Sequence, residues 1–133
     1  MIGILLLSHG TLCEGVLSAM EVIGCSTEQI RAIPLFMESE MDAYTQSVSA
    51  AIDELDTGEG VLVVVDLISG TPFNRSCELY ASKHMAVVTG MSLPLCLTAL
   101  DYRGSESLAD IARLCAEAGK EGVLNLETLL KDQ

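Results

Sequence analysis

Two short polar segments of this 133-residue chain carry the side chains best suited to chemistry. His9 and Gly10 follow an apolar run at residues 2–7, and Asp66 follows a second apolar run at residues 61–65. A neutral imidazole is nucleophilic at one nitrogen only when the other nitrogen carries the proton. An aspartate that accepts that second N–H would fix the tautomer and stabilise the cation that forms. The pair therefore predicts nucleophilic chemistry at His9, with Asp66 orienting the ring.

A third segment, residues 69–74, has the pattern of a helix start. We expect Thr71 as the N-cap residue and Pro72 as the first helical position. Free N–H groups at such a start, with Gly70 leaving room for a close approach, form an anion site that needs no lysine. The hydroxyl groups of Ser69 and Thr71 would add hydrogen bonds. Beside an activated histidine, this segment predicts a site for phosphoryl transfer.

Each of these residues also has an ordinary structural interpretation. His9 on its own could be a solvated loop histidine, and Asp66 on its own a strand-terminating or capping aspartate. Cys13 lies one helical turn after His9 and is a conceivable nucleophile, although small residues at such positions more often serve helix packing. His84 has no chemical partner nearby in the sequence, and we expect it to be exposed and uninvolved.

The sequence gives no sign of a resident metal or cofactor. Its two histidines lie far apart, and its five cysteines include no CxxC pair, so the spacing of a zinc site is lacking. A GxxxxGK[ST] nucleotide-binding loop is also lacking. The predicted chemistry therefore depends on the protein's own side chains, with no metal site and no cofactor.

Composition restricts the partners and the compartment. The net charge of −12, from 19 acidic and 7 basic residues, argues against nucleic acid as a partner and favours a positively charged protein. The apolar runs are too short to cross a bilayer, so we expect no membrane insertion. We see no signal peptide, and the odd number of cysteines suits a reducing compartment. These features predict a cytoplasmic protein.

The elements that must position these residues alternate along the chain. Apolar runs predict strands at residues 2–7, 30–35, 61–65 and 85–89. Helical spacing of apolar residues predicts helices near residues 12–23, 41–55, 73–82, 94–100 and 108–118. We expect the second of these helices to be capped near Ser39 and the last to end at Gly119. Residues 122–126 form a candidate edge strand, and residues 127–131 a last helical turn.

This alternation predicts an α/β fold of three layers in one domain over residues 1–133. The central sheet should be mostly parallel, with four strands, helices on both faces and the candidate antiparallel edge strand at residues 122–126. Ligand chemistry in such sheets collects outside the carboxyl ends of the strands. His9 and Asp66 both lie at such ends, so the fold should bring them to the same edge.

The motifs also resemble those of a known family. They comprise Ser8-His9-Gly10 after the first strand, Gly15, Glu21 and Gly24 in the first helix, Asp66 with Gly70-Thr71-Pro72-Phe73-Asn74, the segment TGMSLP at residues 89–94, and GKEGV at residues 119–123. This combination, in this order, resembles the mannose-type enzyme IIA family of the bacterial phosphoenolpyruvate:sugar phosphotransferase system. The resemblance extends over essentially the whole chain.

The resemblance implies that His9 accepts a phosphoryl group from the phosphocarrier protein HPr, with Nε2 as the suggested atom. It would pass the group to a IIB component that feeds a membrane sugar permease. Asp66 would hydrogen-bond the histidine, and Thr71 would help to hold the phosphoryl group, in a loop that also contains Ser69, Gly70, Pro72, Phe73 and Asn74. Family members are commonly homodimers that can exchange a late edge strand, for which we expect residues 122–126. We expect no fused IIB domain.

One position departs from the family pattern. The family usually has two glycines before the [ST]-P pair, whereas this chain has Ser69 and Gly70. If that position needs a positive φ, Ser69 costs energy that glycine would not. Otherwise the loop takes a different path, and the Ser69 hydroxyl group could add a hydrogen bond.

Three other functions remain open on the sequence. The chain could be a regulatory or binding module on the same scaffold, which would not transfer a phosphoryl group to a IIB protein. It could be the phosphocarrier subunit of a dihydroxyacetone kinase system, although that subunit lacks the T-P-F-N element present here. A small tetrapyrrole chelatase has a similar His-Gly motif but needs a metal site beyond one histidine, so a metal titration would identify it.

Overall fold

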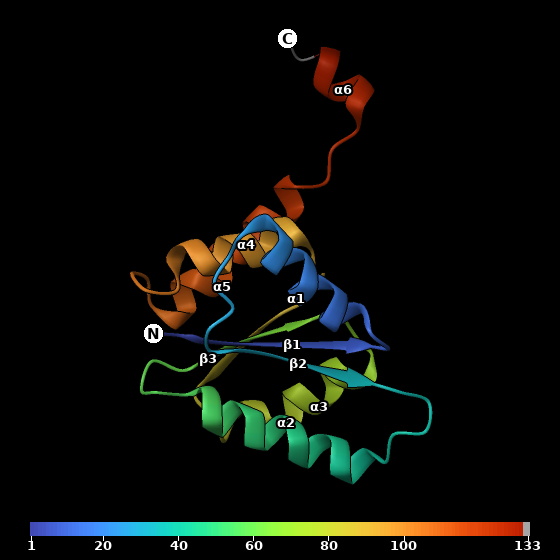
Figure 1. Cartoon of the computed structure of the whole chain (residues 1–133), viewed down its shortest axis with the longest axis vertical. Coiled ribbons are helices and arrows are strands. Elements are labelled where there is room, and N and C mark those ends of the chain that lie inside the picture. Colours follow the sequence, from blue (N-terminus) through green and yellow to red (C-terminus); the bar gives the residue numbers. More distant parts are fainter. Residues whose placement is uncertain (132–133) are drawn as a thin grey trace.

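The computed structural model of the chain describes residues 1–131, and its strands form one four-stranded sheet (Figure 1). All strand pairs are parallel, in the order β2-β1-β3-β4. The strands are β1 (Gly3–His9), β2 (Ile30–Leu35), β3 (Val61–Val65) and β4 (Met85–Val88). The helices are α1 (Leu12–Ile23), α2 (Met41–Leu55), α3 (Thr71–Tyr80), α4 (Leu93–Tyr102), α5 (Leu108–Glu121) and α6 (Leu126–Lys131).

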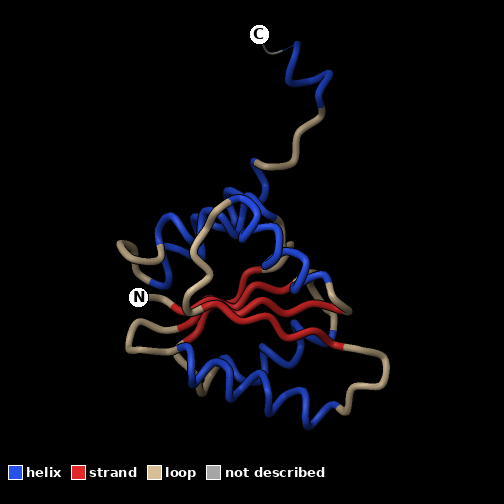
Figure 2. Tube along the Cα trace, viewed as in Figure 1, coloured by secondary structure: helices blue, strands red, loops and turns tan. Residues whose placement is uncertain are grey.

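Helices cover both faces of the sheet, which confirms the predicted three-layer α/β fold (Figure 2). Helices α1, α4 and α5 pack on one face, and helices α2 and α3 pack on the other. Strand β1 alternates between the two cores: Ile4 and Leu6 belong to the first, and Leu5 and Leu7 to the second. A strand buried on both faces must be apolar at every position, which explains its unbroken apolar run.

The strand register places the carboxyl ends of β1, β2 and β3 at one edge. Leu7 pairs with Val65, and His9 pairs with Leu35. His9 is therefore the last residue of β1, and Asp66 directly follows the adjacent strand β3. The parallel topology thus brings together two residues that lie far apart in the sequence.

The N-cap of α3 lies one residue before the predicted position, and the helix covers Thr71–Tyr80 instead of residues 73–82. Gly70, rather than Thr71, is the N-cap residue, and Thr71 is the first helical residue. Gly70 has an extended backbone, with φ −87° and ψ 171°, and its carbonyl group accepts the first helical hydrogen bond from the N–H of Asn74. Pro72 consequently occupies the second helical position, where its missing N–H still costs no hydrogen bond.

Other helix boundaries also differ slightly from the sequence expectation, as the start of α2 and the end of α5 illustrate. Helix α2 is capped by Glu40, whose carboxylate accepts two backbone N–H groups, while the neighbouring Ser39 hydroxyl accepts the N–H of Phe36. Helix α5 continues past Gly119 to Glu121. A Cβ at Gly119 would lie 3.2 Å from Leu95 Cδ1, so this glycine serves the close packing of α5 on α4 instead of ending the helix.

Within the single chain, residues 122–126 do not form the predicted edge strand, and the sheet ends at β4. Gly122 has a helical backbone and packs on Pro94, where an added Cβ would lie 2.8 Å from the proline ring. The chain turns there and leads to α6, which stands away from the rest of the protein (Figure 1). Helix α6 confirms the predicted last helical turn. Among residues 1–131, no helix combines the length and apolar composition needed to cross a membrane.

Candidate active site at the carboxyl edge of the sheet

His9 and Asp66 form the centre of the candidate site. The Nδ1 atom of His9 lies 2.8 Å from Oδ2 of Asp66, and the backbone N–H of His9 donates to the same oxygen at 2.9 Å. The other oxygen, Oδ1, accepts the N–H of Leu67 at 3.0 Å. The imidazole side chain is 47% exposed, whereas the carboxylate is 8% exposed. A buried carboxylate therefore holds one side of a ring whose other side faces solvent.

The charge on Asp66 fixes the tautomer of His9. Burial alone would raise the pKa of Asp66, but the hydrogen bonds from the backbone and ring of His9 and from Leu67 outweigh it, and the pKa of Asp66 is lowered. An ionised carboxylate only accepts hydrogen bonds, so in the neutral ring the proton belongs on Nδ1. Nε2 then carries the free lone pair.

Gly70 allows the imidazole ring to lie against the start of α3. An added Cβ at Gly70 would lie 2.6 Å from Cε1 of His9 and 3.3 Å from Nε2. The backbone of Gly70 has a negative φ, so close approach to the ring, and not backbone conformation, is what requires glycine here. The N-terminus of α3 therefore lies beside the nitrogen that is free to react.

Among residues 71–74 at the start of α3, some side chains pack into the protein and others are exposed. Pro72 is buried, and the half-buried Phe73 packs against the core beneath the sheet. Asn74 is exposed, and Thr71 is half-buried. No side chain caps the start of the helix, so its first N–H groups remain available to an anion.

Ser69 adopts the strained conformation considered for it from the sequence. Its φ is +70°, in the left-handed region that favours glycine, and the residue is exposed. The loop thus keeps a turn of the kind that glycine would make, and Ser69 sustains the strain.

Sequence reasoning gives no separate role to Ser8, which the structure places directly behind His9. Its buried hydroxyl group donates to the carbonyl group of Gly10 at 3.0 Å and accepts the N–H of Cys13 at 2.8 Å. Gly10 has a φ of +57°, and its N–H donates to the carbonyl group of Leu35. These bonds fix the loop after β1. Only the burial of a polar residue at a strand end could have identified Ser8, and burial is not visible in the sequence.

The other sequence candidates lie apart from this centre. Cys13 is fully buried in the core, where burial raises the pKa of its thiol, so its position agrees with helix packing. His84 is exposed, and it directly precedes β4 at the opposite, amino-terminal edge of the sheet. Within the described residues 1–131, no group of three or more His, Cys, Asp or Glu side chains is placed to hold a metal ion.

Exposed apolar side chains occur on the segments next to His9 and Asp66 and form what we call the apolar collar. They come from the start of α1 and from the loops after β2 and β3, namely Leu12, Phe36, Met37, Leu67 and Ile68. Met37 is fully exposed, and Ile68 is 63% exposed. A shallow cavity of about 320 Å³ lies between His9 and the loop after β2. Apolar side chains gathered around a polar centre are typical of a protein-docking surface.

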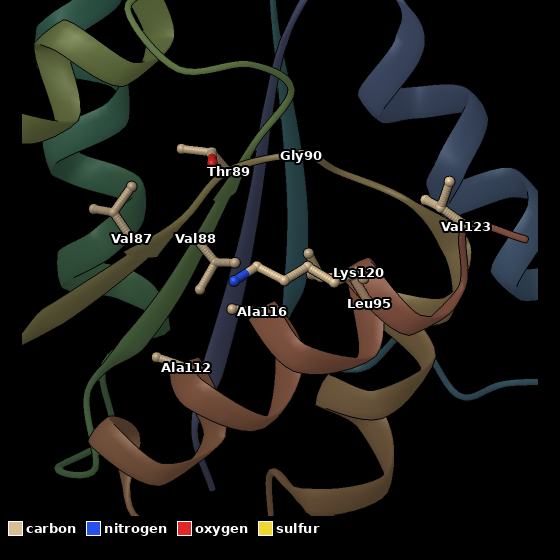
Figure 3. Close-up of a pocket in the computed structure, with 10 residues that line it drawn as sticks. Val87, Val88, Thr89, Gly90, Leu95, Ala112, Ala116, Lys120 and Val123 are labelled. Atoms are coloured by element: carbon tan, nitrogen blue, oxygen red, sulfur yellow. The ribbon is translucent and has the colours of Figure 1, made fainter.

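A larger groove, of about 530 Å³, lies elsewhere, between β4 and α5 (Figure 3). Val87 and Val88 of the edge strand line one side, and Ala112 and Ala116 of α5 line another. The side chain of Lys120 extends across it (Figure 3). None of the catalytic candidates lines this groove, so its size does not mark it as the active site.

Comparisons with known proteins agree on one family. The family model described as PTS system fructose IIA component, of the EIIA-man type, matches residues 3–115. The sorbose-specific EIIA component of Lacticaseibacillus casei is 33% identical over 95 residues, covering 71% of this chain and 68% of that protein.

The mannose-specific EIIAB component of Escherichia coli is 29% identical over 128 residues, which cover 95% of this chain. The chain spans only 40% of the length of that relative. The crystal structure of the phosphotransferase system component EIIA from Streptococcus agalactiae superposes with a TM-score of 0.88 at 26% identity. The superposition covers 96% of this chain and 99% of that one.

Proposed function

The chain belongs to the family of PTS system fructose IIA components, and we propose that it carries a phosphoryl group on Nε2 of His9. Membership of this family supports a carrier role in a sugar phosphotransferase system. The single observation that supports the proposed residue is the 2.8 Å hydrogen bond between Nδ1 of His9 and Asp66. It leaves Nε2 unprotonated, in a ring that is half exposed.

The proposed transfer is an in-line displacement at phosphorus. The lone pair on Nε2 of His9 attacks the phosphoryl group of a phosphohistidine donor, forming one N–P bond while the donor's N–P bond breaks. The donor imidazole leaves with the electron pair of the broken bond. His9 keeps the proton on Nδ1, where Asp66 stabilises the positive charge that the ring gains. Transfer to the next protein is the same step in reverse.

The start of α3 is suited to the developing negative charge. Free N–H groups and the positive end of a helix dipole stabilise equatorial phosphoryl oxygens without a cationic side chain. Thr71 is the first residue of this helix, and its hydroxyl group would add a donor. We assign Thr71 to phosphoryl stabilisation, and Ser69, Gly70, Pro72, Phe73 and Asn74 to the loop that presents it.

We propose HPr as the donor and a IIB component as the acceptor. Both partners would dock on the apolar collar, because its residues lie on the segments next to His9 and Asp66 and each partner must reach the same nitrogen. The net charge of −12 favours a basic partner surface. Such proteins act in the cytoplasm, which we propose as the location.

We also propose that the protein is a homodimer. The segment after Gly122 exposes Val123, Leu124, Leu126 and Leu130, and no residue of α6 is buried. An isolated helix of six residues is unstable in water. A second copy offers the unpaired edge of β4 and the apolar groove beside it as a surface for this segment.

The deciding experiment is phosphorylation with phosphoenolpyruvate, enzyme I and HPr. We expect one acid-labile phosphate on the wild-type protein and none on the His9→Ala variant. His84→Ala is the matched control, since His84 is exposed at the opposite edge of the sheet, and it should be labelled like the wild type. Label on the His9→Ala variant would refute the assignment of the residue.

Onward transfer distinguishes the proposed carrier from the other functions. A labelled protein that donates to a IIB component is a carrier, whereas a labelled protein that retains its phosphate is a regulatory module. Label delivered only to a dihydroxyacetone kinase would identify that system. An unlabelled protein that binds divalent metal would favour the chelatase.

A further inference from the structure

Tyr44 is a buried polar residue that the transfer step described above does not use. It lies in the first turn of α2 and is 5% exposed. Among residues 1–131, its hydroxyl oxygen is the one buried side-chain nitrogen or oxygen without a hydrogen-bond partner. A buried hydroxyl group left unpaired costs about 1–3 kcal/mol. A phenylalanine would fill the same space without that cost, so the hydroxyl group needs an explanation.

The packing of Tyr44 places it under the active site. Its side chain belongs to the core cluster that contains Leu7, Leu35 and Val65. Leu7 lies two residues before His9, Val65 directly precedes Asp66, and the carbonyl group of Leu35 holds the loop at Gly10. Tyr44 therefore lies in the core near the carboxyl ends of β1, β2 and β3, at the start of α2.

The charged groups around Tyr44 point to Asp66 as its partner. Burial raises the pKa of Tyr44 above its ordinary value, and the negative charge of the Asp66 carboxylate raises it further. The hydroxyl group therefore stays protonated and can donate. Glu40 is exposed and its two oxygens each accept a backbone N–H at the start of α2, and the thiol of Cys13 is held neutral by burial. His9 faces Asp66 from the other side through Nδ1.

We propose that Tyr44 is a positioning residue whose hydroxyl group donates to the carboxylate of Asp66 through one bridging water, since none of the described residues 1–131 lies within hydrogen-bond distance of that hydroxyl group. Oδ1 of Asp66 accepts only the N–H of Leu67 and retains a free lone pair, whereas Oδ2 already accepts two N–H groups. The bond would hold the carboxylate while the ring of His9 becomes a cation. The effect of this hydrogen bond on phosphoryl transfer rests on the proposed function, whereas the existence of the bond does not depend on it.

The experiment follows the carboxyl carbon of Asp66 by ¹³C NMR as a function of pH. A hydroxyl donor stabilises the carboxylate, so in the Tyr44→Phe variant the titration midpoint of Asp66 should rise by about half a pH unit. Tyr80→Phe is the matched control, because Tyr80 is exposed on α3, and it should leave the midpoint unchanged. An unchanged midpoint in a folded Tyr44→Phe protein overturns the proposal.

A measurement on the wild-type protein covers the case in which the variant fails to fold. The Cζ resonance of Tyr44 should change with the same midpoint as Asp66, while that of Tyr80 should not. A Tyr44 resonance that is flat through the Asp66 titration overturns the proposal as well.

Phosphoryl transfer then tests the consequence for function. In Tyr44→Phe the transfer rate should fall about threefold to tenfold, and the acid limb of its pH profile should move upward with the Asp66 midpoint. A wild-type rate and profile would overturn the positioning role. If the wild-type protein is never phosphorylated, the proposed function fails, and the Asp66 titration still decides whether the hydrogen bond exists.

Discussion

At the residue scale, the candidate site depends on two adjacent loop positions, Ser69 and Gly70, whose residue type is restricted by backbone conformation or by space. Gly70 must be glycine because the ring of His9 occupies the space of a side chain, although its own φ is ordinary. Ser69 has the opposite problem, since its side chain has space but its φ is +70°. Gly70 lets the ring of His9 lie against the start of α3, and Ser69 carries the backbone strain of the loop.

Replacing Gly70 with alanine should separate activity from stability. The new methyl group would overlap Cε1 of His9, and the half-exposed ring can swing away at little cost to folding. We expect phosphorylation of His9 to slow by about a hundredfold, because a misplacement near 1 Å has that effect. The free energy of unfolding should change by less than about 1 kcal/mol. Gly104→Ala is the control, because nothing lies within 4 Å of that position.

The rate of phosphate labelling measures the effect of Gly70→Ala on phosphorylation, and unfolding in urea measures its effect on stability. A Gly70→Ala protein that is phosphorylated at the wild-type rate would show that the ring does not need its position against α3.

Replacing Ser69 with glycine should stabilise the protein. A non-glycine residue in the left-handed region costs about 1–3 kcal/mol, and the extra freedom of glycine in the unfolded chain returns part of that gain. We expect a net increase of about 1 kcal/mol in the free energy of unfolding, measured in urea. Ser69→Ala keeps the strain and removes the hydroxyl group, so it should bring no increase. Equal stability of the two variants would contradict the argument from strain.

At the scale of elements, the sequence predicts the parts whose burial is uniform. The runs that form β1 and β3 are apolar at nearly every position because both faces of these strands are covered. They can therefore be recognised as buried strands from the sequence alone. The sequence does not predict where α3 begins, since Gly70 and Thr71 are both acceptable N-cap residues. The hydrogen bond from the N–H of Asn74 to the carbonyl group of Gly70 decides between them.

The limits are clearest where distant elements meet. His9 and Asp66 are predictable as neighbours, because the carboxyl ends of adjacent parallel strands share an edge. The unpaired hydroxyl group of Tyr44 is not predictable, because helical spacing identifies the residue as part of the apolar face of α2 and says nothing about what its oxygen meets. At residues 122–126, an apolar pattern suggested a strand, and the packing of Gly122 on Pro94 directs the chain elsewhere.

The loops after β2 and β3 allow a test of docking apart from chemistry. Met37→Gln removes an exposed apolar contact of the collar without adding charge, and should not change stability because the side chain is fully exposed. We expect transfer from phospho-HPr to slow about threefold to tenfold, equivalent to about 1 kcal/mol of binding. Phosphorylation by the small donor phosphoramidate should be unchanged.

Val22→Gln is the matched control, because Val22 is 86% exposed at the far end of α1. If Met37→Gln and Val22→Gln behave alike with phospho-HPr, the collar is not the docking surface.

At the scale of the whole molecule, helix α6 buries no residue against the other described parts of the chain. The body has two cores, one on each face of the sheet, but α6 contributes no buried residue to either. The sheet also ends at β4 with an unpaired edge and an apolar groove beside it. An exposed strand edge and an exposed apolar segment in one chain are each unfavourable alone. Two copies can cover both features at once by exchanging the segment.

This arrangement predicts a dimer that depends on the last residues. Light scattering should give twice the chain mass for the intact protein and a single chain mass for a variant that ends at Gly122. The full-length double variant Leu126→Glu, Leu130→Glu should also be monomeric, because it places two charges on the exposed apolar side of α6. His9 should still be phosphorylated in both variants, since the site lies at the carboxyl edge of β1 within a single copy. A truncated protein that remains dimeric would place the interface on another surface, and α6 would then need a different partner.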